Sequence, residues 1–311
     1  MIILWIITIV LKDGIGIKLD ETIKHVVISP RYSIGEIFEL QRNYKSVDST
    51  IKNALGNETD LLENFSQPIY NLTNGGTHSH KVVYIFVYHR FMDHPHNTWE
   101  ITPKNFFSHL KYFLKKYEII PLNWLIEAIY TRQENFLPDT GIVITIDDGY
   151  RYFYKVLDTV IKYHVPITHC IYTNFIGMKS AFTWDELRNL LEMGFDIQGH
   201  TVSHPVLTHL SRSQIFHELY FSKKLIEDEL GSFVTVIAYP YGVLNKKVTE
   251  MALLADYDGA LTLFWGYNTI ETPEMCLRRI EIYSTDNLRN LIRKMRKSDE
   301  LRKKEVKIWY E

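Results

Sequence analysis

Short apolar runs alternate with amphipathic segments along most of the chain, and each run has the length of a buried strand. Seven runs predict strands, at residues 82–88, 141–145, 166–172, 195–199, 234–238, 259–263 and 277–282. Helices are predicted between them, with N-cap signals at Thr102, Thr183 and Ser211. Strands that alternate with helices pair in parallel, and the even spacing favours a closed or distorted barrel over an open sheet.

Two adjacent acidic residues, Asp147 and Asp148, follow the strand predicted at 141–145. In parallel α/β folds, loops at the carboxyl ends of the strands assemble active sites, so two carboxylates at this edge suggest chemistry. Asp and Gly are also common turn residues, and an Asp-Asp-Gly turn alone is more often structural. The acidic pair therefore indicates a site only together with a second cluster.

The second cluster is a pair of histidines, His200 and His204, which follows the strand predicted at 195–199. A histidine pair alone is more often a packing or surface feature than a metal site. Two imidazoles together with a carboxylate from a neighbouring strand suit zinc and similar divalent metals, and they can leave a coordination position open for water. The sequence therefore predicts a divalent-metal site at this edge of the sheet.

Three motifs, in this order, resemble those of the polysaccharide deacetylases, also called the NodB-homology or carbohydrate esterase family 4 enzymes. Residues 145–150 are similar to the family's TFDDG motif, residues 200–205 to its H[ST]xxHP motif, and residues 238–242 to its PYG motif. The resemblance covers roughly residues 81–297. It implies an α/β fold, a distorted (β/α)7 barrel of the NodB-homology type, which here carries an N-terminal extension.

The resemblance also implies roles for five residues. Asp148, His200 and His204 match the metal ligands of the family, and Asp147 matches the general base that takes a proton from the attacking water. The backbone amide of Tyr241 matches a group that helps to hold the oxyanion. Zinc is the first choice for such ligands, and cobalt, nickel and iron accept a similar set.

Two departures from the family pattern affect the expected site. Ala238 stands where the family often has an arginine that orients the catalytic aspartate, and we expect Arg279 or Arg278 to supply that charge instead. The family's late Leu-x-His motif is not evident, because residues 280–284 contain no histidine. His89 and His209 are the remaining candidates for the general acid.

Tyr88, His89 and Arg90 resemble the start of the family branch that includes the poly-N-acetylglucosamine deacetylases. We therefore expect a hydrolase of linear amides, which removes N-acetyl groups from an N-acetylglucosamine polymer and releases acetate. Two alternatives remain open: an O-acetyl esterase acting on a xylan-like polysaccharide, and a catalytically inactive carbohydrate-binding barrel. Ala238 and the missing late histidine favour the inactive barrel, whereas the retained acids and histidines argue against it.

Composition adds limits on size and partners. At 311 residues and 46% hydrophobic content, the chain is long enough for one large domain with additional segments. A formal net charge of −2 argues against a nucleic-acid partner, so the expected partner is the polysaccharide substrate. Cys170 and Cys276 are the two cysteines, which excludes an extensive disulfide framework.

Residues 2–11 form an apolar run that is too short to span a bilayer but has the length of a signal-peptide hydrophobic region. A strand or helix packed on the domain would give the same pattern. Because the substrates of the resembling family lie outside the cytoplasm, we expect an extracytoplasmic protein, secreted or anchored to the membrane through its N-terminus. The expected domains are an N-terminal extension with a linker at 1–80, the deacetylase domain at 81–297, and a charged C-terminal tail at 298–311.

Overall fold

The structure is a computed structural model that describes residues 81–302, with side chains described through Asp299. The predictions for residues 1–80 and for residues 303–311 lie outside the described residues. Helix α11 (Leu288–Arg302) runs across the boundary predicted at residue 298, and the domain limits stay predictions. Within the described chain, no helix has the length and hydropathy needed to cross a membrane.

Seven parallel strands form one curled sheet in the order β10-β1-β5-β6-β7-β8-β9, and the short β4 adds to β5. All seven were predicted from the sequence; their bounds are Val82–Tyr88 (β1), Thr140–Asp148 (β5), Thr168–Ile171 (β6), Asp196–Gly199 (β7), Val236–Ala238 (β8), Gly259–Leu261 (β9) and Ile280–Glu281 (β10). The prediction missed three two-residue strands, β2 (Arg90–Phe91), β3 (Glu100–Ile101) and β4 (Glu118–Ile119). These are too short to give a periodic signal.

One stretch of chain, residues 277–282, brings the two edges of the sheet together, and we call it the closing segment. Its start pairs with β9, because the N–H of Leu277 donates to the carbonyl of Ala260 at 2.8 Å. Its end pairs with β1, because the N–H of Ile282 donates to the carbonyl of Val87 at 3.0 Å. The seven strands therefore form the distorted barrel that the sequence predicted.

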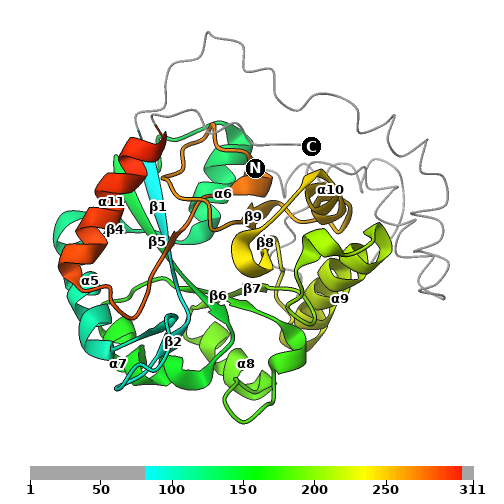
Figure 1. The fold of residues 1–311 in the computed structure, drawn as a ribbon, viewed down its shortest axis with the longest axis horizontal. Coiled ribbons are helices and arrows are strands. Elements are labelled where there is room, and N and C mark those ends of the chain that lie inside the picture. Colours follow the sequence, from blue (N-terminus) through cyan, green and yellow to red (C-terminus); the bar gives the residue numbers. More distant parts are fainter. Residues whose placement is uncertain (1–80, 303–311) are drawn as a thin grey trace, which may run out of the picture. The chain divides into compact units, whose positions relative to one another are not determined.

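Seven helices surround the strands in the described chain (Figure 1). They are α5 (Pro103–Lys116), α6 (Leu122–Thr131), α7 (Tyr154–Lys162), α8 (Trp184–Glu192), α9 (Arg212–Leu230), α10 (Lys246–Leu254) and α11. The three predicted N-caps are confirmed, since the side chains of Thr102, Thr183 and Ser211 each accept a hydrogen bond from the backbone of the first turn. The last two form capping boxes.

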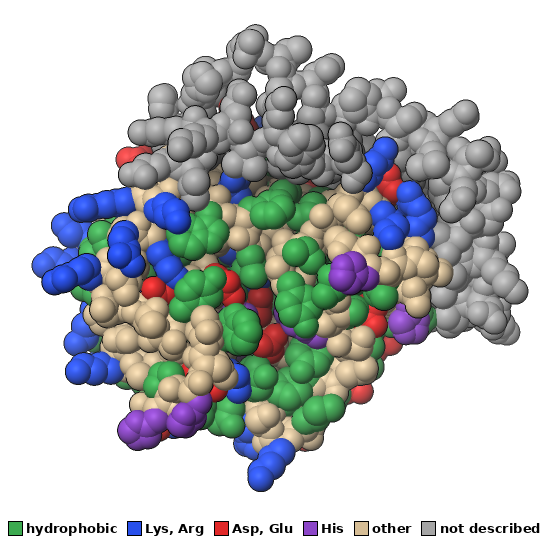
Figure 2. All heavy atoms as spheres, in the orientation of Figure 1, with side chains coloured by type: hydrophobic (Ala, Val, Ile, Leu, Met, Phe, Trp, Pro, Cys, Tyr) green, Lys and Arg blue, Asp and Glu red, His purple; other side chains and the backbone are tan. Residues whose placement is uncertain are grey.

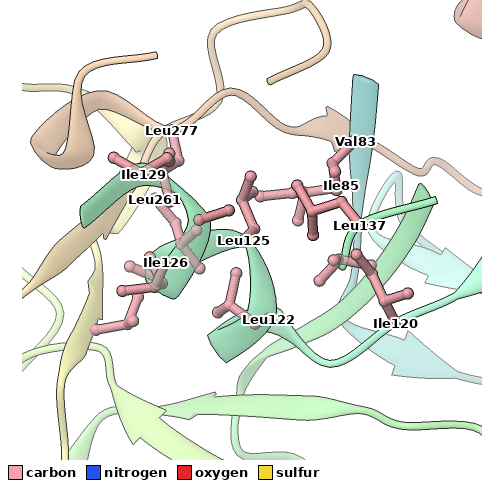
Figure 3. Packing of buried hydrophobic residues seen from close by; sticks show 14 of the residues in the cluster. Val83, Ile85, Ile120, Leu122, Leu125, Ile126, Ile129, Leu137, Leu261 and Leu277 are labelled. Carbon is pink, nitrogen blue, oxygen red and sulfur yellow. The ribbon is translucent and has the colours of Figure 1, made fainter. Parts of the chain in front are cut away.

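Helix α6 fills the end of the barrel where the strands begin (Figure 3). Its apolar residues, including Leu125 and Ile126, pack in one buried cluster with Val83 of β1, Leu261 of β9 and Leu277 of the closing segment. At the start of β9, a Cβ on Gly259 would lie 2.6 Å from the Cδ1 atom of Ile126, so glycine permits this close packing. With this end filled by apolar side chains, the opposite end, where the strands finish, is left for polar residues.

Candidate metal and catalytic site

The acidic and histidine motifs meet at the carboxyl ends of β5, β6 and β7. Asp148 of β5 pairs with Ile171 of β6, and Ile171 pairs with Gly199 of β7, the residue before His200. Register alone therefore puts the acids and the first histidine on neighbouring strand ends. Figure 2 shows acidic and histidine side chains in a hollow near the middle of one face, bordered by hydrophobic side chains.

Asp148, His200 and His204 converge on one point. The Oδ1 atom of Asp148 lies 3.5 Å from Nε2 of His200 and 3.5 Å from Nε2 of His204. One candidate ligand atom from each of the three residues lies within 4.8 Å of the others. Two imidazole nitrogens and a carboxylate oxygen at this spacing fit a divalent cation of the zinc type. The expected ligand set is thus brought together.

Hydrogen bonding orients His200 for this role. Its Nδ1 atom lies 2.7 Å from the carbonyl oxygen of Ala238, to which an Nδ1–H group can donate. Such a bond leaves the Nε2 atom to face the carboxylates, as in histidines that bind a metal. Burial acts to lower the pKa of His200, but the hydrogen bond that the ring donates to Asp148 and the charge of Asp147 raise it above its usual value. A proton and a cation would therefore compete for the Nε2 atom of His200.

Four residues at this site adopt uncommon backbone conformations. Asp148, Thr201, His204 and Tyr241 have φ values of 76°, 77°, 59° and 60°, all in the left-handed region. Each such non-glycine residue costs roughly 1–3 kcal/mol and persists only where the surroundings hold it. Four of the seven non-glycine residues with positive φ in the described chain lie at this one site. This clustering is typical of functional sites.

Asp147 points into the barrel, where it meets Arg279. The Nη1 atom of Arg279 lies 2.8 Å from Oδ1 of Asp147, and both side chains are buried. Burial acts to raise the pKa of Asp147, but the charges of Arg279 and His200 and the hydrogen bond from Arg279 hold it below its usual value. Asp147 is therefore ionised at neutral pH. Its second oxygen, Oδ2, lies 4.0 Å from Nε2 of His200, beside the ligand cluster.

The arginine expected from elsewhere in the chain is Arg279 and not Arg278. Arg279 also donates through Nε to the carbonyl of Thr262 at 2.9 Å, which fixes the guanidinium between two strands. The side chain of Arg278 instead donates to the carbonyl of Trp265 at 3.0 Å. Because neighbouring residues of an extended segment point to opposite sides, only one of the two can face the barrel interior.

Tyr241 lies in a short 3-10 turn, η4 (Pro240–Gly242), next to the histidines. Its ring centroid is 4.9 Å from that of His204, and 56% of the residue is exposed. Within the described chain, the hydrogen bond of this turn runs from the N–H of Gly242 to the carbonyl of Tyr239 at 2.9 Å, and it does not use the N–H of Tyr241. The ring of Tyr241, whose backbone amide is the predicted oxyanion group, thus lies beside His204.

The two candidates for the general acid differ in position. His89 follows β1 directly, its charge acts on both Asp147 and Asp148, and its Nδ1 atom is buried without a hydrogen-bond partner among the described residues. His209 is an exposed residue of the turn η3 (Leu207–His209). Ile282, in the region where the family's late histidine was sought, is buried and apolar. The structure brings His89 to the site.

Aromatic rings lie next to His204 on the side of β6. The ring of Tyr172 lies 5.3 Å from that of His204 and stacks on Phe175 at 5.1 Å. Tyr150 packs edge-on against Phe175 at 4.8 Å, and the guanidinium of Arg90 lies 4.9 Å from the Tyr150 ring. We call Tyr150, Tyr172 and Phe175 the aromatic wall. Only Tyr150 belongs to a sequence motif, so the other two residues were not predicted from the sequence. Sequence reasoning also missed Glu218, described below, which looks like an ordinary surface residue of a helix.

Comparison with known proteins agrees with the geometry. The sequence profile described as "Polysaccharide deacetylase" matches residues 135–260, which contain the acidic, histidine and PYG motifs. The fold is similar to that of the deacetylase PplD from Streptococcus pyogenes in complex with acetate, with a TM-score of 0.63 and 23% identity, over 69% of this chain and 98% of that one. Residues 135–260 therefore carry the sequence pattern of the polysaccharide deacetylases, within a fold that is similar to that of PplD.

Other similar proteins match different lengths of the chain. YxkH from Bacillus subtilis, a protein named after the polysaccharide deacetylases, is 26% identical over 187 residues, which are 60% of this chain and 67% of YxkH. The peptidoglycan-N-acetylglucosamine deacetylase PgdA from Listeria monocytogenes is 30% identical over 111 residues, 35% of this chain and 23% of PgdA. IcaB from Ammonifex degensii shares the fold, with a TM-score of 0.60 and 18% identity over 68% of this chain and 95% of IcaB.

Proposed function

We propose that this polysaccharide deacetylase removes N-acetyl groups from an N-acetylglucosamine polymer, using a divalent cation held by Asp148, His200 and His204. The observation that carries the proposal is the convergence of the Nε2 atoms of both histidines on Oδ1 of Asp148, each at 3.5 Å, with the ionised Asp147 beside them. A cation in this position would lower the pKa of a water molecule and polarise the acetyl carbonyl.

Asp147 acts as the general base in this proposal. Its Oδ1 atom is taken up by Arg279, so Oδ2 is the oxygen that faces the ligands and can accept a proton from the attacking water. Water oxygen adds to the acetyl carbon, the carbon–nitrogen bond breaks, and the amine leaves with a proton while acetate is released. The N–H of Tyr241, whose ring lies beside that of His204, is the donor we assign to the developing oxyanion.

Three observations support the substrate class. The Listeria relative is named for N-acetylglucosamine in peptidoglycan, and the start of the domain at Tyr88, His89 and Arg90 resembles the poly-N-acetylglucosamine branch. The half-buried rings of Tyr150 and Tyr172, which pack against the buried Phe175, offer apolar faces that match the C–H face of a pyranose. We place poly-N-acetylglucosamine first, with peptidoglycan and chitin oligomers next.

Acetate release from N-acetylglucosamine oligomers tests the proposal. The protein is stripped of metal, then reloaded with zinc or cobalt, and β-1,6- and β-1,4-linked oligomers are compared with acetylated xylan. We expect reloading to restore release from the amide substrates. Release from the esters alone would replace the proposed reaction with O-deacetylation, and no release by protein that binds metal would favour the inactive barrel.

Two isosteric variants separate the base from the ligands. Asp147→Asn removes the base but no ligand, so we expect acetate release to fall by about 10²–10⁴-fold while metal affinity is kept. Asp148→Asn removes a ligand, so we expect both metal affinity and acetate release to fall. Equal loss of metal affinity in the two variants would contradict the assigned roles.

We also propose that the protein acts outside the cytoplasm, secreted or held at the membrane through its N-terminus. The support is the apolar run at residues 2–11 together with the extracytoplasmic position of cell-wall and exopolysaccharide substrates. Protease added to intact producing cells, or analysis of the culture medium, tests the location. Full protection inside intact cells would exclude it.

A further inference from the structure

The two histidine ligands belong to one short loop, residues 200–204, which we call the histidine loop. It follows β7 directly and contains two residues with left-handed backbone, Thr201 and His204. Such a conformation is unfavourable for residues with a side chain, so the loop needs support from outside. The spacing of the two Nε2 atoms depends on this support, because both ligands move with the loop.

Glu218 of α9 supplies the most extensive side-chain support to this loop. The N–H groups of Val202 and Ser203 donate to its Oε2 atom at 3.0 and 2.8 Å, and the hydroxyl of Ser203 donates to its Oε1 atom at 2.7 Å. One carboxylate thus binds both residues that lie in the middle of the loop. Hydrogen bonds to an ionised acceptor are stronger than neutral ones. Because the carboxylate binds two neighbouring amides, it fixes the orientation of the loop backbone as well as its distance from α9.

Other contacts hold the loop on its remaining sides. The carbonyls of Thr201 and Val202 accept from the N–H groups of Thr173 and Asn174, at 3.1 and 2.9 Å. The N–H of His204 donates to the hydroxyl of Thr201 at 3.0 Å. The amides of Val202 and Ser203 are the part of the loop backbone that depends on α9, a helix that supplies no metal ligand.

We infer that Glu218 is a positioning residue for the metal site: it fixes the histidine loop so that His200 and His204 are spaced for a cation before the cation binds. The inference rests on the proposed metal site and adds to it a residue that does not touch the metal. Removing a group that orients metal ligands typically weakens metal affinity by about 10–100-fold. We expect that range for Glu218→Ala.

The test measures affinity for cobalt and zinc by competition with a chromogenic chelator, and it records the visible spectrum of the cobalt-loaded protein. Glu218→Gln keeps one oxygen that can accept from both amides, so we expect an affinity between those of the wild type and Glu218→Ala. Ser203→Ala removes one of the three hydrogen bonds and should weaken binding least. An altered cobalt spectrum in Glu218→Ala would report a changed arrangement of the two imidazoles.

Glu227→Ala is the matched control. Glu227 lies on the same helix and its Oε1 atom also accepts a backbone N–H, that of Val234 at 3.0 Å, away from the histidine loop. We expect this variant to lose thermal stability but to keep its metal affinity. Equal affinities in the wild type and Glu218→Ala, or equal losses in Glu218→Ala and Glu227→Ala, would overturn the inference.

The outcome is independent of the substrate, because only metal binding is measured. Wild-type protein that binds cobalt but releases no acetate would contradict the proposed function and still allow Glu218 to be tested. Wild-type protein that binds neither metal would contradict the proposed site itself. If Glu218→Ala does not fold, as judged by circular dichroism, then Glu218→Gln and Ser203→Ala decide: wild-type affinity in both would overturn the inference.

Discussion

Arg279 and Asp147 form a buried ion pair, and its main effect is to keep Asp147 ionised. Without the guanidinium, burial would raise the pKa of the carboxyl group and favour its neutral form. The pair therefore keeps the carboxylate of Asp147, the proposed general base, ionised although the side chain is buried. Breaking such a buried pair by removing one partner typically costs about 3–5 kcal/mol of stability, because the other charge is left uncompensated.

Replacement of Arg279 by methionine should reduce activity most strongly at acidic pH. The pKa of Asp147 rises when the guanidinium is lost, so the carboxylate becomes protonated at a higher pH. The acidic limb of the kcat/KM profile therefore shifts to higher pH. Arg279→Lys keeps the charge and should shift the limb less. Arg278→Met is the control, because its side chain contacts Trp265 and not Asp147. An acidic limb that lies at the same pH in Arg279→Met and in the wild type would contradict this role of Arg279.

His89→Gln should affect the leaving group selectively. A departing amine needs a proton, whereas the phenolate of p-nitrophenyl acetate leaves without one, so only the amide reaction depends on a general acid. We expect acetate release from the amide to fall by about 10²–10⁴-fold, with a much smaller effect on the activated ester. Equal losses on both substrates would remove His89 from this role. The exposed His209, replaced by glutamine, serves as the control.

At the scale of elements, the turns that follow the strands hold the site residues in place, and these turns are closely packed at Gly242. A Cβ at this position would lie 2.4 Å from the backbone nitrogen of Leu263, after β9, and its φ is 67°. Tyr241, the residue before it, has positive φ as well. The turn at residues 240–242 therefore packs closely against the loop that follows β9, and the ring of Tyr241 lies beside that of His204.

Gly242→Ala should cost more stability than Gly231→Ala and should also reduce activity. Gly231 ends α9 with a similar φ of 64°, but a Cβ there would have nothing within 4 Å. We expect about 1 kcal/mol for Gly231, the usual cost of the left-handed conformation, and a larger loss for Gly242, because Leu263 must move. Urea unfolding and acetate release measure the two effects. Equal stability losses would show that Leu263 yields without strain.

The strands that carry the motifs were predictable because each has a clear apolar run that ends in polar residues. Register then brings Asp148 and His200 to neighbouring strand ends without further information. The choice between Arg278 and Arg279 was not predictable, since it depends on which side of the closing segment faces the barrel. Glu218 gave no signal either, because its partners are backbone amides, which have no residue type to recognise.

At the scale of the whole molecule, buried histidines link stability to pH. His169 of β6 is fully buried, its two ring nitrogens have no hydrogen-bond partner among the described residues, and Phe153, Phe182 and Phe195 surround its ring. Burial lowers its pKa to about 3, from 6.5 for the free group. The folded state therefore holds this side chain in its neutral form.

His169→Leu should make the protein less sensitive to acid. Between pH 6.5 and about 3, the unfolded state binds a proton at this residue and the folded state does not, so the stability that it contributes is present above this window and lost as pH falls through it. The slope is about 1.4 kcal/mol per pH unit. Urea unfolding at pH 7 and pH 5 should show the variant gaining on the wild type at the lower pH. The exposed His217, replaced by leucine, should leave the difference unchanged.

The closing segment, residues 277–282, is synthesised after the strands that carry the acidic and histidine motifs, and this order affects the site. A nascent chain that stops before residue 277 already carries Asp147, Asp148, His200 and His204, yet it lacks the guanidinium that Asp147 needs once it is buried. In such a chain, the free edges of β1 and β9 also face each other unpaired, and unpaired strand edges invite association with other chains. Arg279 belongs to the same residues that seal the barrel, so the proposed base gains its counter-charge only when the strand edges are paired.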